Sequence, residues 1–506
     1  MDGADQTEST PESGSSFVQQ DVEKSTAFMT TEQVTHAIES LAVEMGINQK
    51  KLMRKIDMRL VPTLCVLYLW AFLDRVNMSN ANSFGLSTDL KLVGNQYNTA
   101  LTMFFVPYIV CEIPSNMLMK RFKPHVWLSL CMFLFGLVTA MQGLVQNYSG
   151  LLATRFFLGV AEAGMFPGCF YLLAMWYRRV ESQVRYSFFF ASTSLAGAFA
   201  GLLASAIGKM QGMRGYNGWR WIFILEGVAT AVLGLIFFFC IADFPEEAKF
   251  LDDNERKFVK IKLEMDVGKS QRSTTGSFKT VLSAFKDPKI FLAGFMYFGL
   301  IIPSYGYAYF ATNIIHNFGY SSIKTQLYSV PPWAASFFIS LIVAWFSDRM
   351  RHRYAFVVLM AVIGLIGEAI LLTVQDRTSV RYGALFMVTG GMYSAMPIIV
   401  CWTTTNLCGH IKRATGTGWQ VGFGNVGGII ATFAFLAKDA PKYTVGAALG
   451  IAFPAFSIIA STIYVLLLAR DNRRKDKGIG LEKWDAMTDN ERLDNLEMSP
   501  SYRFQY

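Results

Sequence analysis

An acid and a base stand side by side near the start of the chain, at Asp74 and Arg75. The unbroken apolar run before them, Leu60–Leu73, covers only about 21 Å as a helix at 1.5 Å per residue. This length is too short to cross the hydrocarbon core of a bilayer. A crossing helix must therefore continue through Asp74, Arg75 and Asn77, which predicts that both charges lie at membrane depth. The alternative is an ion pair that caps the helix at the membrane surface.

A second acid and base, Arg155 and Glu162, stand in another long apolar stretch. They are seven residues apart, so on a helix they differ by only about 20° around the axis and about 10.5 Å along it. Both side chains therefore face the same polar environment, and Gly159 leaves space between them. Two turns is long for a direct salt bridge, which favours a bond from one of them to another helix or to a ligand.

An acid and a base on each of two helices is what proton-coupled transport of an anion needs. Arginine keeps its charge and binds a carboxylate through two parallel hydrogen bonds. A carboxyl group beside such a site changes its proton affinity when the anion arrives. That dependence would couple the proton to the substrate.

Other polar residues of the apolar stretches give weaker signals. Glu112 is expected to form a structural pair near a helix end, and Glu226 to pair with Arg220 or Arg214. Aromatic and amide side chains in the second half of the chain could line a cavity, although packing or a place at the membrane interface is the more common role for such residues. These side chains are Tyr305, Tyr307, Tyr309, Asn313, Trp402, Asn406, Gln420 and Asn425.

The composition describes the elements that must position these residues. Of the 506 residues, 52% are hydrophobic and 16% are charged, and the mean hydropathy is +0.32. A soluble protein carries about 25% charged residues. This excludes a soluble multi-domain enzyme, a nucleic-acid-binding protein and a disordered scaffold. The seven cysteines and five histidines are dispersed, so we expect no disulfide framework, no metal site and no cofactor.

The apolar stretches are each about 20 residues long, the length of a membrane-crossing helix. They predict an all-α polytopic membrane protein, with twelve helices arranged as two six-helix bundles. The spans are expected at roughly 58–80, 97–119, 125–146, 150–176, 184–208, 219–242, 289–315, 325–347, 354–374, 380–404, 413–436 and 445–469.

The polar segments divide the chain into five parts. Residues 1–50 are rich in Ser, Thr, Glu and Gln and predict a disordered tail. The N-terminal bundle is expected at 51–242 and the C-terminal bundle at 288–470. Between them, 243–287 predicts a linker with an amphipathic surface helix. Residues 471–506 form a second tail.

Lys and Arg residues near the spans are concentrated in the two flanks and the central linker. By the positive-inside rule, both termini and the linker are cytoplasmic. The net charge of +9 is therefore attributed to the cytoplasmic face and its anionic lipids. We expect a monomer in the plasma membrane, with a small organic anion, protons and the bilayer as partners and no nucleic acid.

Several motifs resemble a known family. FLDRVN at 72–77, RFFLGVAEAGMFPG at 155–168 and FSDRMRHR at 346–353 are similar to the major facilitator superfamily and, within it, to the anion:cation symporter group. DLKLVGNQYNTALTMFFVPYIVCEIPSN, GWRWIFILEG and AKDAPKY resemble its fungal allantoate permease branch. Members of that branch import nicotinate, allantoate, pantothenate, biotin and related carboxylates. The similarity covers about residues 51–470.

This resemblance implies residue roles. It assigns proton coupling to Asp74 and Glu162. It assigns substrate binding to Arg75 and Arg155, in a site to which Asn77 and the second-half residues would contribute.

The loop after the second span departs from the family pattern. Met119 or Lys120 replaces the acid expected there, whereas Asp348 and Arg349 keep the motif in the second half. Gating would therefore depend more on Asp348.

Two other functions compete with proton-coupled import. An exporter of a secondary metabolite could use the same fold, but the fifth span has Ala198 after Gly197, where proton antiporters typically have Gly-Pro. A non-transporting nutrient receptor would not need a pair of buried acids that titrate.

Overall fold

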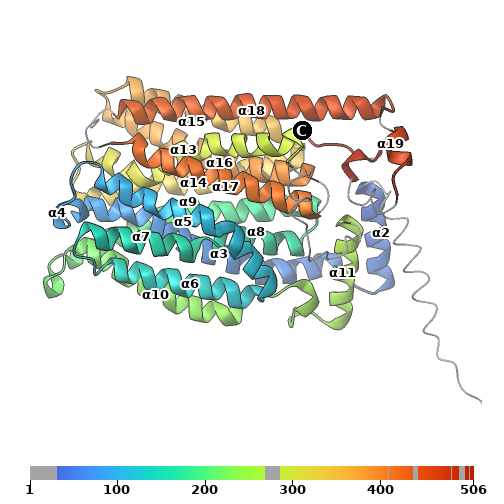
Figure 1. Ribbon diagram of the computed structural model, residues 1–506, viewed down its shortest axis with the longest axis horizontal. Coiled ribbons are helices and arrows are strands. Elements are labelled where there is room, and N and C mark those ends of the chain that lie inside the picture. The colour runs from blue at the N-terminus through green and yellow to red at the C-terminus, as the bar shows by residue number, and fades with distance from the viewer. Residues whose placement is uncertain are drawn as a thin grey trace, which may run out of the picture.

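The computed structural model describes residues 31–267, 285–407, 410–436, 443–479, 481–488, 496–500 and 502–506. Within these ranges the chain is helical and contains no strand (Figure 1). Ten helical segments are long and apolar enough to cross a membrane. Two further helices, α5 (Gln96–Arg121) and α17 (His410–Ala434), lie beside them in the same bundle. The predicted all-α, two-bundle membrane architecture is confirmed.

The helices form two halves that lie against each other, drawn from blue to green and from yellow to red in Figure 1. Besides α5, the N half contains α3 (Gln49–Ser83), α6 (Pro124–Gln142), α7 (Tyr148–Glu162), α8 (Met165–Trp176), α9 (Arg179–Ile207) and α10 (Gly218–Cys240). Besides α17, the C half contains α13 (Pro288–His316), α14 (Ser322–Met350), α15 (Arg353–Thr373), α16 (Thr378–Asn406) and α18 (Thr444–Asp476).

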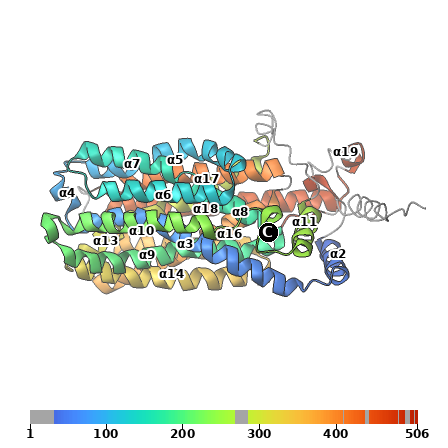
Figure 2. The ribbon, with the colours of Figure 1, turned by 90° about the horizontal axis from the view of Figure 1, so that it is seen from below.

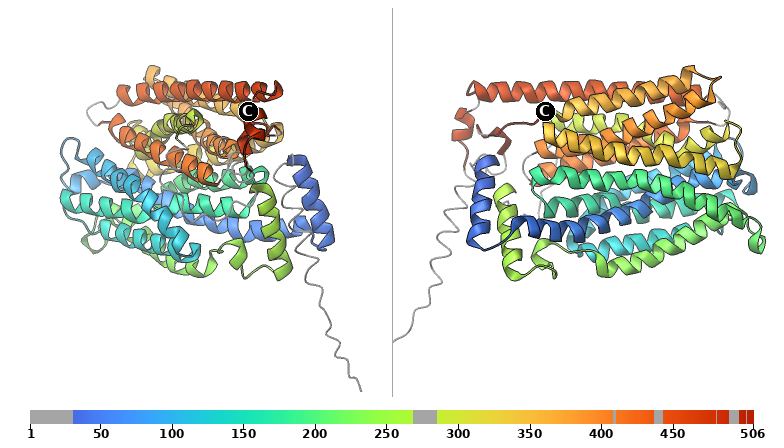
Figure 3. Two further views of the ribbon diagram at one scale, coloured as in Figure 1. Left: turned by 45° about the vertical axis from the view of Figure 1, so that its right-hand side comes forward. Right: turned by 180° about the vertical axis from the view of Figure 1, so that it is seen from behind.

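The two ends of the bundle carry different short elements (Figure 2). One end, here the α4 end, carries α4 (Leu86–Asp89). The opposite end, here the α11 end, carries α2 (Thr31–Glu44), α11 (Asp253–Val267) and α19 (Leu481–Asp485). Figure 3 shows that α2 and α11 run across the direction of the long helices.

The structure differs from the expected disordered tail at α2. Val34, Ile38 and Ala42 recur every four residues, so they share one face of a helix, and all three are buried. The apolar face of α2 packs against α11, where Phe258 and Val259 are also buried. Polar composition hid this stripe in the sequence. Residues 1–30 and 268–284 of the predicted tail and linker lie outside the described residues.

The fourth span crosses as one apolar segment, Tyr148–Trp176, with a short interruption between α7 and α8. Pro167 has no N–H to donate to the carbonyl of Ala163, and its ring crowds that carbonyl. The chain turns at Ala163 and Gly164 before α8 begins. Glu162 is therefore the last residue of α7, in the middle of the bundle.

Close packing of α7 on α5 aims the polar face of α7 inward. A Cβ atom on Gly159 would lie 2.2 Å from the carbonyl oxygen of Phe104, so only glycine permits this approach. Arg155 and Glu162, on the same face of α7 as Gly159, are both buried.

The interface between the two halves, here called the seam, is formed chiefly by α3 with α13, α5 with α17, and α9 with α14. Hydroxyl and amide groups cross the seam toward the α4 end. Ser79 and Thr312 share a hydrogen bond of 2.5 Å, and Asn98 donates to the carbonyl oxygen of Thr432 at 2.5 Å. In the middle of the bundle, Ser194 bonds to Ser336 at 3.1 Å.

Candidate functional site

Arg75 of α3 lies at the seam and links three helices. Its Nη2 donates to Glu162 Oε1 of α7 at 2.6 Å, and its Nη1 donates to the hydroxyl of Tyr305 of α13 at 2.5 Å. The side chains of Arg75 and Glu162 are only 4% and 2% exposed. Arg75 Nε and Glu162 Oε2 have no hydrogen-bond partner. The Arg75–Glu162 pair therefore lies within the N half, is connected to the C half through Tyr305, and retains unused hydrogen-bonding capacity.

Aromatic rings surround the Arg75 guanidinium. Its central carbon lies 5.2 Å from the ring centroids of both Phe104 and Tyr108 of α5, and 5.8 Å from that of Tyr305. Tyr305 stacks on Tyr309 with centroids 5.7 Å apart. The negative faces of such rings stabilise a cation where water is absent.

Asp74 points away from this pair, into the N half. Its Oδ2 accepts a hydrogen bond of 2.7 Å from the hydroxyl of Thr139 on α6. Its other oxygen, Oδ1, is buried and has no partner. Adjacent residues of α3 therefore serve different neighbours, because side chains one position apart on a helix diverge by about 100°.

Arg155 is the least satisfied charged side chain of the site. It is 2% exposed, and its Nε and Nη2 have no hydrogen-bond partner. Asp74, Tyr309 and Tyr97 are the groups that act on it electrostatically, ahead of Glu162. A guanidinium whose N–H groups are buried without acceptors is costly. Arg155 is therefore suited to a ligand that supplies hydrogen-bond acceptors.

The spacing argument for α7 is confirmed. Arg155 and Glu162 do not pair directly, and Glu162 instead bonds to Arg75 on another helix. The two arginines consequently lie at different depths, with Arg155 nearer the α4 end.

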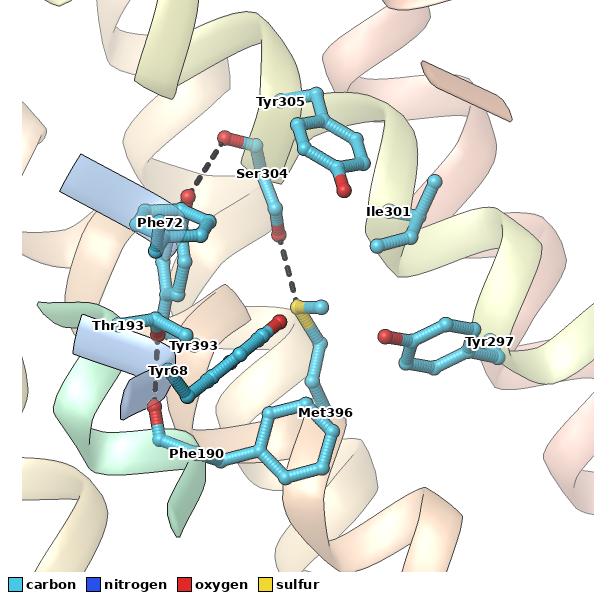
Figure 4. Close-up of a pocket in the computed structure, with 10 residues that line it drawn as sticks. All are labelled: Tyr68, Phe72, Phe190, Thr193, Tyr297, Ile301, Ser304, Tyr305, Tyr393 and Met396. Atoms are coloured by element: carbon cyan, nitrogen blue, oxygen red, sulfur yellow. Dashed lines mark hydrogen bonds between the residues drawn. The ribbon is translucent and has the colours of Figure 1, made fainter. Parts of the chain in front are cut away.

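A small pocket lies at the seam beside Tyr305, with a cavity volume of about 20 Å³. Figure 4 shows the hydroxyl groups of Tyr297 and Tyr305 turned toward it. The wall comes from both halves: Tyr68 and Phe72 of α3, Phe190 and Thr193 of α9, Tyr297, Ile301, Ser304 and Tyr305 of α13, and Tyr393 and Met396 of α16. An aromatic lining with a few hydroxyl groups is typical of sites for organic molecules, but this volume holds about one water molecule, so the seam must open to admit anything larger.

The remaining predicted site residues are distributed unevenly. Tyr305 and Tyr309 lie at Arg75. Asn77 is fully buried but donates to Glu226 Oε2 of α10. Asn313 is half-buried near the α4 end of α13, where its backbone carbonyl accepts from the N–H of Asn317.

The expected pairing of Glu226 with Arg220 or Arg214 is wrong. Arg220 instead pairs with Asp89 at 3.0 Å. Arg220 lies at the first turn of α10 and Glu226 six residues further in, so they face different surroundings.

The structure does not bring Trp402 and Asn406 to this site. Both are buried at the α11 end of α16, where they hold Gln505. Trp402 Nε1 and Asn406 Nδ2 donate to the Gln505 carbonyl oxygen at 2.8 and 2.9 Å, and the Gln505 N–H donates to Asn406 Oδ1 at 2.9 Å.

Asp348 and Arg349 also lie at the α11 end, away from Arg75. Asp348 is half-buried, and the charges of Arg353, Arg351 and Arg185 act on it. The Arg349 side chain lies over the ring of Trp345. Arg185 belongs to α9 of the N half, so its charge acts on Asp348 across the two halves.

Sequence reasoning missed Thr139 and Tyr108 as partners in the site, whereas Asn425 was among the side chains expected to line a cavity. Thr139 is an isolated hydroxyl in an apolar run, and Tyr108 follows Phe104 by one turn. Asn425 Oδ1 accepts from the Tyr305 hydroxyl at 3.4 Å. The periodicity of α5 could have flagged Tyr108, whereas nothing in the sequence connects Thr139 with Asp74.

The expected structural pair at Glu112 is not found either. Neither of its carboxylate oxygens has a hydrogen-bond partner, although the side chain is buried.

Among the described residues, no group of three or more His, Cys, Asp or Glu side chains could hold a metal ion.

Comparisons with known proteins agree with this architecture. The family model described as Major Facilitator Superfamily matches residues 64–432. The chain is 33% identical over 472 residues to the MFS-type transporter cnsO of Penicillium expansum, covering 91% of each. It is 31% identical over 467 residues to the major facilitator-type transporter hxnP of Emericella nidulans, covering 90% of this chain and 93% of that protein.

A solved structure shows the same fold at low identity. The E. coli fucose:proton symporter FucP matches 80% of this chain and 98% of its own, with a TM-score of 0.58 and 16% identity. This likeness concerns the fold alone.

Proposed function

The chain belongs to the major facilitator superfamily and is a multi-pass membrane transporter, and from this premise we propose that it imports a small organic anion together with protons. The observation that carries the proposal is the state of Arg155. A permanently charged group with two N–H-bearing nitrogens buried and unpaired needs an acceptor. A carboxylate supplies two acceptor oxygens in the matching geometry.

Arg75 gives the proposed site its link to protons. In this structure Glu162 accepts a hydrogen bond from one edge of the Arg75 guanidinium, through Nη2. When Glu162 takes up a proton, its attraction for Arg75 falls, and Arg75 can bind the anion instead. Proton binding and anion binding then favour each other, which is the thermodynamic requirement for symport.

Asp74 is proposed to act on Arg155 in the same way. It is a nearby acid whose charge acts on Arg155, and one of its oxygens is unpartnered. A proton on Asp74 would leave Arg155 with more net positive charge toward the substrate. The Thr139 hydroxyl holds Asp74 in place.

The pocket beside Tyr305 supports a flat carboxylate as the cargo. Tyr68, Tyr297 and Tyr393 offer ring faces and hydroxyl groups, and Arg75 is bonded to the Tyr305 that closes one wall. Once the seam opens, a nicotinate-like molecule would place its ring between these side chains and its carboxylate toward the arginines. Allantoate and vitamin-like carboxylates are further members of the proposed class.

We place the α11 end in the cytoplasm and the protein in the plasma membrane. The Lys and Arg residues of the flanks and linker support this orientation. Alternating access would then open the seam first at the α4 end and later at the α11 end, where Asp348 is proposed to take part in gating.

The test is uptake of labelled nicotinate, allantoate, pantothenate and biotin by cells that lack their own carriers for these compounds. We expect at least one to accumulate, faster at acidic external pH, and to be lost on adding a protonophore. Cells expressing Arg155→Leu at equal surface abundance are the control. Export from preloaded cells with no uptake would contradict import, and uptake indifferent to the protonophore would contradict proton coupling.

A further inference from the structure

Glu112 is an acid in the middle of α5 that the proposed mechanism does not use. Its side chain is 3% exposed, and both carboxylate oxygens are buried without a hydrogen-bond partner. It follows Tyr108, whose ring also lies against Arg75, by four residues, which places it about 6 Å further along α5 toward the α11 end. An acid left unpaired at membrane depth requires an explanation.

Glu112 faces the seam. On the opposite side, a Cβ atom on Gly422 of α17 would lie 3.7 Å from Glu112 Oε2, an ordinary contact distance, so the Glu112 carboxylate reaches the surface of α17. The side-chain amide of Asn425, one turn further along α17, also lies near Glu112, although no hydrogen bond within 3.5 Å joins them. Asn425 also accepts a hydrogen bond from Tyr305, which is bonded to Arg75. Glu112 therefore lies where the site and the contact between the two halves meet.

We propose that Glu112 is a second proton-binding residue, whose neutral form lets α5 and α17 close and whose ionised form separates them at the α11 end. This inference deepens the proposed proton coupling and rests on it for its role in transport. The structure would then correspond to the form in which Glu112 carries its proton.

The charged and titratable groups around Glu112 support this assignment. Arg75 of α3 attracts its charge, but that guanidinium is already paired with Glu162 of α7. Tyr108 of its own helix and Tyr297 and Tyr305 of α13 are neutral hydroxyl-bearing rings. An ionised Glu112 would thus be buried without a free cation beside it, a costly arrangement that water entering an opened seam would relieve.

The helix carrying Glu112 is built to bend. Pro107 and Pro114 each remove one backbone hydrogen bond from α5, and they stand on either side of Glu112. Bends of membrane helices are commonly located at proline. A change at Glu112 can therefore move the α11 end of α5 without moving the part that packs on Gly159.

Release of the Glu112 proton on the cytoplasmic side is the direction that import requires. With the α11 end in the cytoplasm, separation of α5 and α17 exposes Glu112 to cytoplasmic water. Its proton would be released on that side as the seam opens, and the anion would leave by the same opening.

Spin-label distances across the α11 end test the proposal. The seven native cysteines are replaced, and labels are attached at Phe122 and Met350, which are 46% and 57% exposed in the N half and C half. Purified protein in nanodiscs is measured without substrate from about pH 5 to about pH 8. In the parent, we expect the distance distribution to move to longer values as pH rises.

Substitutions at Glu112 decide the matter. Glu112→Gln keeps the shape but cannot ionise, so the short distance should persist at every pH, and Glu112→Met should behave alike if the glutamine variant does not fold. The matched control is Glu226→Gln, a buried acid of the same half that bonds to Asn77 and should keep the parental response. A parental pH response in Glu112→Gln, or none in the parent, would overturn the proposal. Because no substrate is present, these results are independent of the uptake assays.

Discussion

Two buried polar clusters, one in each half, differ in whether their hydrogen bonds are complete. In the N half, Arg75, Asp74, Arg155 and Glu162 each retain at least one buried polar atom without a partner. In the C half, a second cluster, here called the tail clamp, consists of Trp402, Asn406 and Asn472 holding residues 502–506, and these three side chains leave no buried side-chain nitrogen or oxygen without a partner.

The side-chain amides of the tail clamp bind the backbone N–H and carbonyl groups of the last residues. Asn472 Nδ2 donates to the Phe504 carbonyl oxygen and Asn472 Oδ1 accepts from the Phe504 N–H, both at 3.0 Å. Asn406 makes the same paired contact with Gln505. Lys289 lies over the Phe504 ring at 4.2 Å. Each side chain has found its partner within the chain, which is typical of a structural role.

The difference separates binding from stability. Buried polar groups that the fold satisfies stabilise it, and buried groups that it leaves open are available to something else. Both clusters contain residues that the sequence singled out for substrate, yet only the N-half cluster has capacity left for one. The comparison predicts opposite outcomes for substitutions in the two places.

The largest effect is expected for Glu162→Gln. The amide keeps the shape and the hydrogen bond to Arg75 but cannot titrate, so proton-driven accumulation should be abolished while binding or exchange of substrate persists. Accumulation and counterflow in the same vesicles measure the two activities separately. Concentrative uptake with the parental pH profile would remove Glu162 from the coupling role.

The second-largest effect is expected for Arg155→Lys. The ammonium keeps the charge but cannot form two parallel hydrogen bonds to a carboxylate. Losing one charge-assisted hydrogen bond costs about 1.5–3 kcal/mol, or roughly tenfold to more than a hundredfold in affinity. Binding to purified protein gives the Kd, with monodispersity as the control. Near-parental affinity would mean that Arg155 only balances the nearby acids.

Substitutions in the tail clamp should lower the stability of the protein and leave substrate binding unchanged. Asn472→Ala leaves the Phe504 N–H and carbonyl oxygen without their partner, at a cost of about 1–3 kcal/mol. We expect a lower temperature of thermal unfolding and an unchanged substrate Kd. A weakened Kd at unchanged stability would contradict the structural role of the clamp.

The smallest effect is expected at the surface pair Lys55–Glu255, which holds α11 against α3 at 2.6 Å. Burial pushes the pKa of Glu255 up, but the bonds from Lys55 and from the Asp252 N–H outweigh it and leave that pKa below its ordinary value. The stabilisation is therefore present at neutral pH and is lost as pH falls through the depressed pKa. Glu255→Gln should cost less than about 1 kcal/mol and less still at high salt. A loss as large as that of Asn472→Ala would refute this ranking.

Sequence reasoning located the four charges of the N-half cluster because ionised side chains are rare in membrane spans. It could not name their partners. Arg75 and Glu162 are 87 residues apart, and nothing local shows that α3 and α7 meet. Pro167 was a signal in the sequence for the interruption after Glu162, which the expected continuous span did not include.

The second half was harder to read. An aromatic or amide side chain in a span has the same sequence signature whether it lines a cavity, as Tyr305 does, or holds another segment, as Trp402 and Asn406 do. Their contact with Gln505 joins residues about a hundred positions apart. In α2, the polar composition led to the prediction of a disordered tail, although three apolar residues at helical spacing were present.

The central claim is that the N-half cluster binds an anion and a proton together. Calorimetric titration of purified protein with the transported carboxylate, in two buffers of different ionisation enthalpy, counts the protons exchanged on binding. We expect proton uptake in the parent, tighter binding at lower pH, and a smaller proton uptake in Glu162→Gln. Carboxylate binding that exchanges no proton and has the same affinity across the pH range would contradict the account.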